Sequence, residues 1–138
     1  MTFDEVRIQR FLATRDVAVL ATVQADGAPL AMSMWFLHDP AGLTMISVAG
    51  TQKVRNLGRD PRVSMVVEGG LGAGDVRGVA IQGRAEFLSD GPERRALAER
   101  FLEKYRPYLE RRWGGRAMPP DRVMFRIAPS RVRSWGLD

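Results

Sequence analysis

Three apolar runs of strand length, separated by two short turns, constrain the fold of this chain more than any other feature. The runs cover 17–23, 30–38 and 43–48, and the first of them, Val-Ala-Val-Leu-Ala-Thr-Val, has the β-branched composition of a buried strand. The turns at 25–29 and 39–42 contain Asp-Gly and Asp-Pro-Ala-Gly. We therefore expect the fold to begin with an antiparallel meander of three strands.

The remainder of the chain continues mainly as strands. We expect further strands at 62–68, 76–88, 122–127 and 131–135, and helices at 3–14, 51–59 and 89–113, the last interrupted by Pro107. Glycines at 69–74 indicate a loop that is a candidate lid. About six strands in hairpin connection with few helices predict a mainly β fold, a small closed or split barrel.

Size and composition exclude several classes of protein. At 138 residues we expect a single domain over 1–138, and no apolar run approaches the roughly 20 residues of a membrane span. The start has no secretory signal pattern and the chain has no cysteine, so we expect a cytoplasmic protein without disulfides. The net charge of +5 allows an anionic partner. Because the basic residues are scattered, we expect a solvated arginine-rich surface and no nucleic acid binding.

The segment 47–57 is the candidate anion site. It follows a strand, turns through Ala49-Gly50 and enters a helix whose N-cap position is Thr51, with a side-chain oxygen free for the first-turn amides. Lys53 and Arg55 add cations to this turn, although the helix dipole favours acids there. Only two of the 21 basic residues are lysines, and a lysine suits a phosphate as a compact charge. The alternatives are a phosphate clamp and an ordinary capped helix with a solvated basic turn.

Side chains for catalysis are sparse. The one histidine, His38, lies beside a turn, where a surface position is expected, and it leaves no basis for a Ser-His-Asp triad or a multi-histidine metal site. No two carboxylates form an evident acid–base pair. We therefore expect no catalytic side chain and no metal, and we expect a bound cofactor to carry any chemistry.

The order of these parts resembles the pyridoxamine 5'-phosphate oxidase-like superfamily of flavin-binding split barrels, from about residue 11 to 135. The resemblance rests on the strand-turn-helix at 47–56 followed by Asp-Pro-Arg-Val-Ser at 60–64. It implies a six-stranded antiparallel split β-barrel that forms homodimers, with cofactors in grooves at the interface. The cofactor-binding residues that it implies, on the ring-facing strand, at the end of the third strand and in the helical turn, are Met32, Ser33, Met34, Ser47, Thr51, Gln52, Lys53, Arg55 and Asn56.

Two positions depart from the flavin mononucleotide (FMN) members of this superfamily. Gln52 stands where the pyridoxamine phosphate oxidases proper have arginine, and Gly78 replaces a glutamine that usually touches the flavin. The sequence Gly-Thr-Gln-Lys-Val-Arg-Asn-Leu at 50–57, Trp-Phe at 35–36 and the closing segment 127–135 are more similar to the branch that uses the 5-deazaflavin coenzyme F420.

This resemblance implies an oxidoreductase that passes hydride from reduced F420 to a conjugated or quinone-like small molecule. The candidate walls of the substrate site are Met34, Trp35 and Trp135, for which packing in the core or at an interface is the alternative. An FMN-dependent oxidoreductase and a non-catalytic cofactor-binding protein of the same fold are the other readings.

Overall fold

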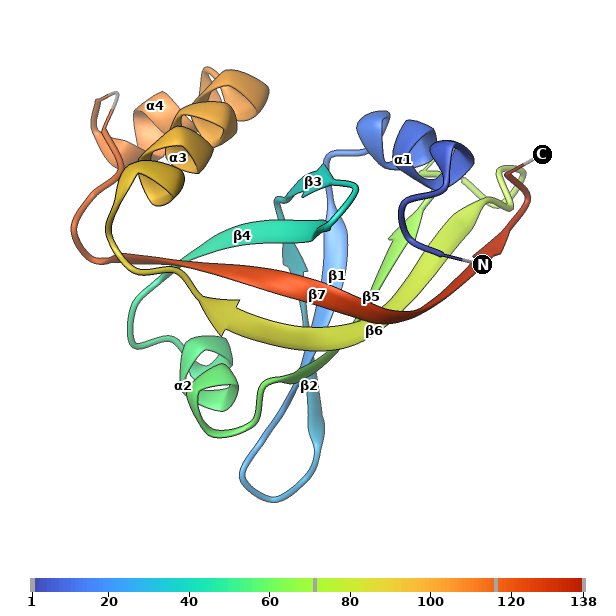
Figure 1. Cartoon of the computed structure of the whole chain (residues 1–138), viewed down its shortest axis with the longest axis horizontal. Coiled ribbons are helices and arrows are strands. Elements are labelled where there is room, and N and C mark those ends of the chain that lie inside the picture. The colour runs from blue at the N-terminus through green and yellow to red at the C-terminus, as the bar shows by residue number, and fades with distance from the viewer. Residues whose placement is uncertain (1, 71, 116, 138) are drawn as a thin grey trace.

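The computed structural model describes residues 2–70, 72–115 and 117–137. The helices are α1 (Val6–Ala13), α2 (Gln52–Arg59), α3 (Pro92–Tyr105) and α4 (Tyr108–Trp113). The strands are β1 (Ala18–Val23), β2 (Pro29–Met34), β3 (Leu37–Asp39), β4 (Gly42–Val48), β5 (Arg62–Glu68), β6 (Gly78–Phe87) and β7 (Arg122–Trp135). The fold is mainly β, and the strands form a strongly curled antiparallel sheet (Figure 1).

The order of strands in the sheet is β2-β1-β5-β6-β7-β4-β3, seven strands over the described residues where the family resemblance implied six. The two antiparallel pairings of the predicted meander are present, since β2 pairs with β1 and the short β3 pairs with β4, but the predicted middle strand is not continuous, and β4 pairs along its length with β7. The predicted strand 30–38 breaks at Trp35 and Phe36, and its two parts become the two edge strands of the sheet. The barrel is therefore split at this break.

Helix α3 supplies the hydrogen bonds that a neighbouring strand would give to Phe36. The Phe36 N–H donates to the Tyr105 hydroxyl oxygen at 2.8 Å, and that hydroxyl lies 2.9 Å from the Phe36 carbonyl oxygen and 2.8 Å from that of Asp16. Lys104 Nζ also donates to the Phe36 carbonyl oxygen, at 2.8 Å. Because buried backbone groups need partners, these two side chains stabilise the break between β2 and β3.

Because of Lys104, we expect the free energy of unfolding to depend on pH in the alkaline range. Burial is the main cause that lowers its pKa from 10.5 to about 8 in the folded protein. Between these two values the unfolded chain binds more protons than the folded chain, so the free energy of unfolding rises as pH increases through this window. We expect urea unfolding to show this rise between pH 8 and 10, and Lys104→Met to remove most of it, leaving the contribution of Lys53, whose pKa burial also lowers. An equal rise in the variant would contradict the assignment.

The long hairpin of β6 and β7 differs from prediction at its C-terminal half. The two strands expected at 122–127 and 131–135 form one strand, β7, with a bulge at Ser130, opposite Gln82 and Gly83. A Cβ on Gly83 would lie 2.3 Å from the Ala128 carbonyl oxygen, so the bulge requires glycine at this position.

Two groups of buried side chains hold the sheet and helices together. One fills the inside of the curled sheet under α1 and includes Phe11, Leu20, Phe36, Met45, Ile81 and Phe125. The other lies between the sheet and the pair α3–α4 and includes Leu97, Phe101, Tyr105, Leu109, Trp113 and Met124. Helix α3 ends at Tyr105 and α4 begins at Tyr108, which confirms the predicted interruption at Pro107.

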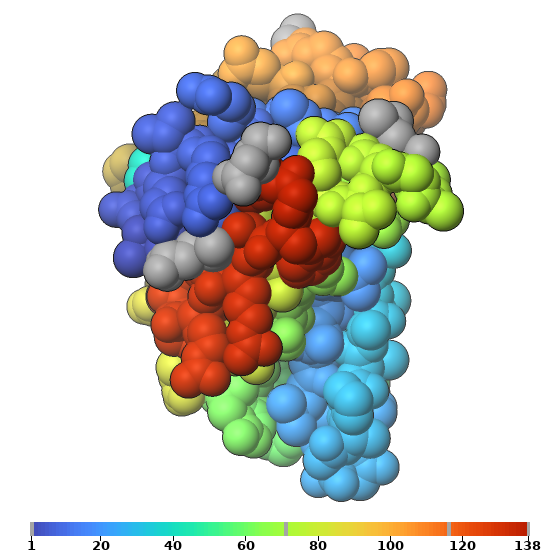
Figure 2. All heavy atoms as spheres, turned by 90° about the vertical axis from the view of Figure 1, so that its right-hand side faces the viewer, coloured from blue at the N-terminus to red at the C-terminus, as the bar shows by residue number. Residues whose placement is uncertain are grey.

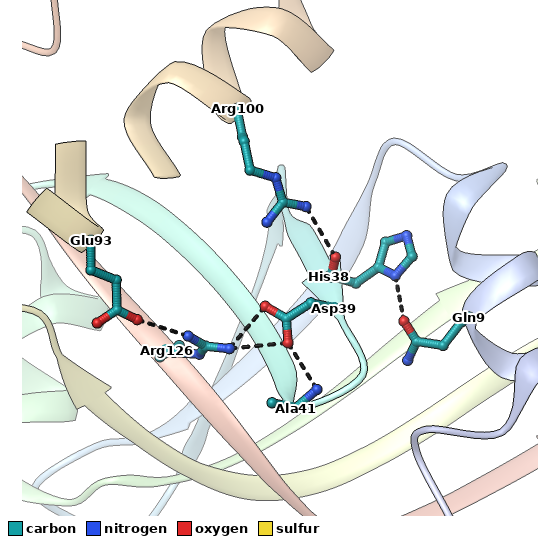
Figure 3. Close-up of polar contacts among 7 residues, drawn as sticks. All are labelled: Gln9, His38, Asp39, Ala41, Glu93, Arg100 and Arg126. Carbon is teal, nitrogen blue, oxygen red and sulfur yellow. Dashed lines mark hydrogen bonds and ion pairs between the residues drawn. The ribbon is translucent and has the colours of Figure 1, made fainter. Parts of the chain in front are cut away.

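Polar contacts tie the short edge strand β3 to three other elements (Figure 3). Asp39 accepts two hydrogen bonds from Arg126 of β7, at 3.0 and 2.8 Å, and Arg126 also bonds Glu93 of α3 at 3.0 Å. His38 Nδ1 lies 2.8 Å from the side-chain oxygen of Gln9 in α1. His38 is thus half-buried and partnered, where the sequence indicated a surface residue.

The predicted glycine-rich segment 69–74 lies between β5 and β6, and its Leu71 falls outside the described residues. Its role as a lid stays a prediction. Among the described residues, no helix has the length and apolar character needed to cross a membrane.

Candidate functional site

A pocket of about 290 Å³ opens where the ends of β2 and β4 meet the start of α2 and the helix pair α3–α4. Its walls come from β2 with the adjoining Trp35, from β4, from the helices α2, α3 and α4, and from the first residue of β7. The lining residues are Ser33, Met34, Trp35, Ile46, Ser47, Val48, Lys53, Phe101, Leu109, Arg112, Trp113 and Arg122. Five of the sequence-predicted residues therefore come together here: Ser33, Met34, Trp35, Ser47 and Lys53.

The turn into α2 lies at the predicted position, but the expected capping hydrogen bond from its N-cap residue is absent. Thr51 occupies the N-cap position, yet its hydroxyl makes no capping bond to the helix. It donates instead to the Val48 carbonyl oxygen at 3.1 Å and lies 3.5 Å from the Ser47 hydroxyl. The predicted role of the Thr51 oxygen as a helix cap is therefore wrong. The first-turn amides are left without a side-chain acceptor at the positive end of the helix, a favourable place for an anion.

Lys53 is the group in this pocket that most needs a partner. It is half-buried, burial lowers its pKa below the usual 10.5, and it makes no hydrogen bond or ion pair within the described part of the chain. A partly desolvated ammonium without a counter-charge is unfavourable for the folded state. An anion bound in the pocket would satisfy it.

Two arginines that the sequence analysis did not single out add to the positive charge. Arg112 of α4 lies with its guanidinium carbon 5.3 Å from the centre of the Trp35 ring. Arg122, the first residue of β7, bonds Asp121 and also lines the pocket. With Lys53 the pocket has three cationic residues and no acidic one among its lining residues. This charge favours a ligand with phosphate or carboxylate groups.

The aromatic residues Trp113 and Phe101 lie in the helical segment predicted at 89–113, but the sequence analysis did not place them in a site. A single sequence shows that Arg111-Arg112-Trp113 combines cations with an aromatic ring. It does not show over which strand ends this helix packs, because that depends on long-range contacts. The pocket's α3–α4 wall was therefore missed.

Three predicted residues in α2 have partners inside the protein. Asn56 is buried; its amide nitrogen donates to Thr22 Oγ1 at 3.0 Å, and its oxygen accepts from Gln52 Nε2 at 2.8 Å. Arg55 bonds the Gly50 carbonyl oxygen and, at 2.7 Å, the Gln52 side-chain oxygen. Gln52, Arg55 and Asn56 do not line the pocket, and the structure gives them contacts that shape the turn.

Two further predicted residues, Met32 and Trp135, do not line this pocket. Met32 is exposed on β2, one residue before Ser33. The indole of Trp35 stacks on the ring of Tyr105, with ring centroids 4.7 Å apart. Trp135 lines a second, larger cavity of about 850 Å³, which Ser33 also lines. Trp35 and Trp135 are thus brought to different cavities, with Ser33 common to both.

The second cavity shares Ser33 of β2 with the first pocket. Figure 2 shows that several of the elements that line it, the C-terminal end of β7, the segment between β5 and β6, and the strands β1 and β2, lie on one face of the molecule. The first pocket alone is at the small end of the range for ligand sites, roughly 300–1,000 Å³. A large cofactor would therefore place only part of itself there. Within the described ranges, no group of three or more acidic, histidine or cysteine side chains is arranged for a metal.

The chain belongs to the pyridoxamine 5'-phosphate oxidase family, whose sequence profile matches residues 5–136. It is 31% identical over 99 residues to an F420H(2)-dependent biliverdin reductase from Mycobacterium tuberculosis, covering 70% of this chain and 68% of the relative.

Solved structures agree with this family. The conserved hypothetical protein Rv2991 from Mycobacterium tuberculosis is 30% identical, with a TM-score of 0.80 over 96% of this chain and 84% of that one. A structure named F420 reductase is 26% identical, with a TM-score of 0.61 over 86% of this chain and 89% of that one. The predicted superfamily and the predicted split-barrel fold are confirmed.

Proposed function

We propose that this protein is a cytoplasmic, homodimeric oxidoreductase that binds coenzyme F420 and reduces a conjugated or quinone-like small molecule. The observation that carries the proposal is Lys53, a half-buried ammonium without a partner among the described residues, at the start of an uncapped helix. This arrangement fits the phosphate of a flavin-type cofactor. The cations Arg112 and Arg122 in the same pocket support a ligand with several negative charges, as F420 has.

Three features favour F420 over FMN. The relative with 31% identity is named for its F420 dependence, and it matches over more than two thirds of both chains. Gln52 stands in place of the arginine of the FMN-dependent oxidases, and in this structure it bonds Asn56 and Arg55 instead of facing the pocket. Gly78 offers no side chain to a flavin ring. FMN remains the alternative, supported by the family to which the chain belongs.

The residues of the chain bind and orient the cofactor. The first-turn amides of α2, Lys53 and the hydroxyls of Ser47 and Thr51 would hold the phosphate. The β2 backbone at Met32–Met34 would lie along the ring system, since Ser33 borders both cavities. When bound and reduced, F420 supplies a hydride to the acceptor, and water supplies the accompanying proton. Holding the ring at a fixed place on a strand is the protein's contribution to rate.

A homodimer is supported by apolar side chains that are exposed next to this region. Val17, Val19 and Val76 lie exposed around the second cavity, which shares Ser33 with the first pocket. Clustered exposed apolar residues are typical of interaction surfaces. We therefore place the dimer contact beside the cofactor groove.

Parallel titrations of the purified protein with F420 and with FMN test the proposal. Trp35 and Trp113 line the first pocket, so their fluorescence should respond to occupancy. We expect F420 to bind more tightly than FMN. Tighter binding of FMN would establish the alternative cofactor, and binding of neither would overturn an oxidoreductase function of this kind.

A further inference from the structure

A third, small cavity of about 210 Å³ lies where the break between β2 and β3 meets the helices α3 and α4. Its lining residues are Asp16, Trp35, Lys104, Tyr105 and Tyr108. The indole of Trp35 lies at 10° to the ring of Tyr105 and at 52° to that of Tyr108, whose centroid is 6.3 Å away. Three aromatic rings around so small a space favour a flat aromatic ligand.

Lys104 places an amine nitrogen at the wall of this aromatic cavity. Its Nζ lies 4.1 Å from the centre of the Phe36 ring and 5.1 Å from that of Tyr105. It donates one hydrogen bond, of 2.8 Å, to the Phe36 carbonyl oxygen. Because burial lowers its pKa to about 8, about half of the Lys104 amines are neutral near pH 8. The neutral amine of a lysine is the form that attacks carbonyl carbon atoms.

The charged groups around Lys104 favour a cation at this position. The carboxylate of Asp16 raises the pKa of Lys104, whereas Arg100, on the same helix, lowers it. Asp16 has the larger of these two effects, and it is the acidic residue among those that line the cavity. A cationic product formed at Nζ would therefore have a counter-charge beside it.

We propose that this cavity is a covalent binding site in which Lys104 reacts with aromatic aldehydes to form a Schiff base. The amine lone pair attacks the aldehyde carbon, and a C–N bond forms as the carbonyl π bond breaks. The resulting carbinolamine loses water as the C=N bond forms, so the reaction needs no oxidant or reductant. The protonated imine retains one N–H, which donates to the Phe36 carbonyl oxygen in place of the ammonium. The aryl ring packs against Trp35 and Tyr108.

This activity goes beyond the proposed oxidoreductase function and does not depend on it. Lys104, Tyr105 and Tyr108 line neither the cationic pocket nor the second cavity. Trp35 borders both the cationic pocket and this third cavity. A trapped aldehyde would therefore lie next to the proposed cofactor site without occupying it.

Reductive trapping on the purified protein tests the proposal. Benzaldehyde and sodium cyanoborohydride near pH 8 convert the imine to a stable benzylamine, which peptide mass spectrometry locates. Lys53 is the other lysine of the chain and is also half-buried, so it is an internal control. We expect benzylation of Lys104 to exceed that of Lys53 and to saturate with aldehyde concentration, because binding precedes the reaction. Equal or greater labelling of Lys53, or labelling of Lys104 that never saturates, would overturn the assignment.

An aromatic wall is tested by Tyr108→Leu. Tyr108 is 54% exposed, so its replacement leaves the buried core in place. We expect trapping at Lys104 to fall roughly three- to tenfold, as for loss of one aromatic contact, with no change at Lys53. The matched control is Phe87→Leu, which alters an aromatic residue of β6 that is 40% exposed and does not line the cavity. It should leave both lysines unchanged, and an unaltered Lys104 signal in Tyr108→Leu would contradict the aromatic wall.

Cyclohexanecarbaldehyde tests the class of aldehyde, since its ring has the same number of carbon atoms as that of benzaldehyde but is not flat. The ratio of Lys104 to Lys53 labelling is compared for the two aldehydes, because their intrinsic reactivities cancel in this ratio. We expect the ratio to be higher for benzaldehyde. An equal or higher ratio for the saturated ring would overturn the aromatic class.

Discussion

Replacing Lys53 with methionine is expected to weaken F420 binding about 10- to 150-fold, the equivalent of roughly 1.5–3 kcal/mol for a lost charge-assisted hydrogen bond. The ammonium is half-buried and unpartnered over the described ranges, so an anion in the pocket gives it a counter-charge that the protein does not supply. Methionine keeps most of the aliphatic stem and removes the charge. Fluorescence titration of the wild type and the variant measures the change.

Arg55→Met is the matched control for Lys53→Met. Arg55 lies in the same turn, but it is exposed and bonded to Gly50 and Gln52, and it does not line the pocket. If the pocket binds the phosphate, losing Arg55 should cost far less affinity than losing Lys53. Equal losses of affinity would mean that the turn acts only through its overall positive charge. An unchanged affinity in Lys53→Met with a retained fold would rule out Lys53 as a phosphate-binding residue.

The same lysine predicts how affinity depends on pH. Burial lowers the pKa of Lys53 in the free protein, and a bound anion stabilises the protonated form and raises this pKa. The contribution of Lys53 is complete below the free-protein pKa and is lost as pH rises through the bound-state pKa. In Lys53→Met this loss of affinity at alkaline pH should disappear.

Local signals in the sequence were sufficient for most elements of the fold. The run 62–68 became β5 with the predicted bounds, and Pro107 separates α3 from α4, because proline and β-branched residues act on their own neighbourhood. The pairing of β4 with β7 instead of β2 was not visible. It depends on the break at Phe36, whose backbone bonds to Tyr105, 69 residues away.

As with the fold, only the locally encoded part of the candidate site was predictable from the sequence. Lys53 could be proposed because the start of a helix has a recognisable local pattern, whereas Ser33 and Ser47 were implied only by the family resemblance. Arg112 and Arg122 could not, because nothing near them in the sequence indicates that α4 and the start of β7 reach the same pocket. The separation of Trp35 from Trp135 is likewise a consequence of strand order, which local patterns do not determine.

Asn56→Ala is expected to lower the free energy of unfolding by about 2–4 kcal/mol, combining an unsatisfied buried partner with a small cavity. Asn56 is fully buried, and its side chain joins Thr22 of β1 to Gln52 in the first turn of α2. Removing it leaves the buried Thr22 hydroxyl without this partner. Urea unfolding of the protein without cofactor measures the effect, and Gln52→Ala, an exposed residue in the same network, should cost much less.

A double variant distinguishes a structural Asn56 from one that binds the cofactor. Replacing both partners with apolar groups, as in Asn56→Leu with Thr22→Val, removes the unsatisfied hydroxyl, so the pair should destabilise less than the sum of the single changes. If Asn56 only stabilises the turn into α2, the folded fraction of the double variant should lose F420 affinity only to the extent that the conformation of this turn changes. Unchanged stability with a large loss of affinity would mean that Asn56 turns from Thr22 to the cofactor, the role that family resemblance implies.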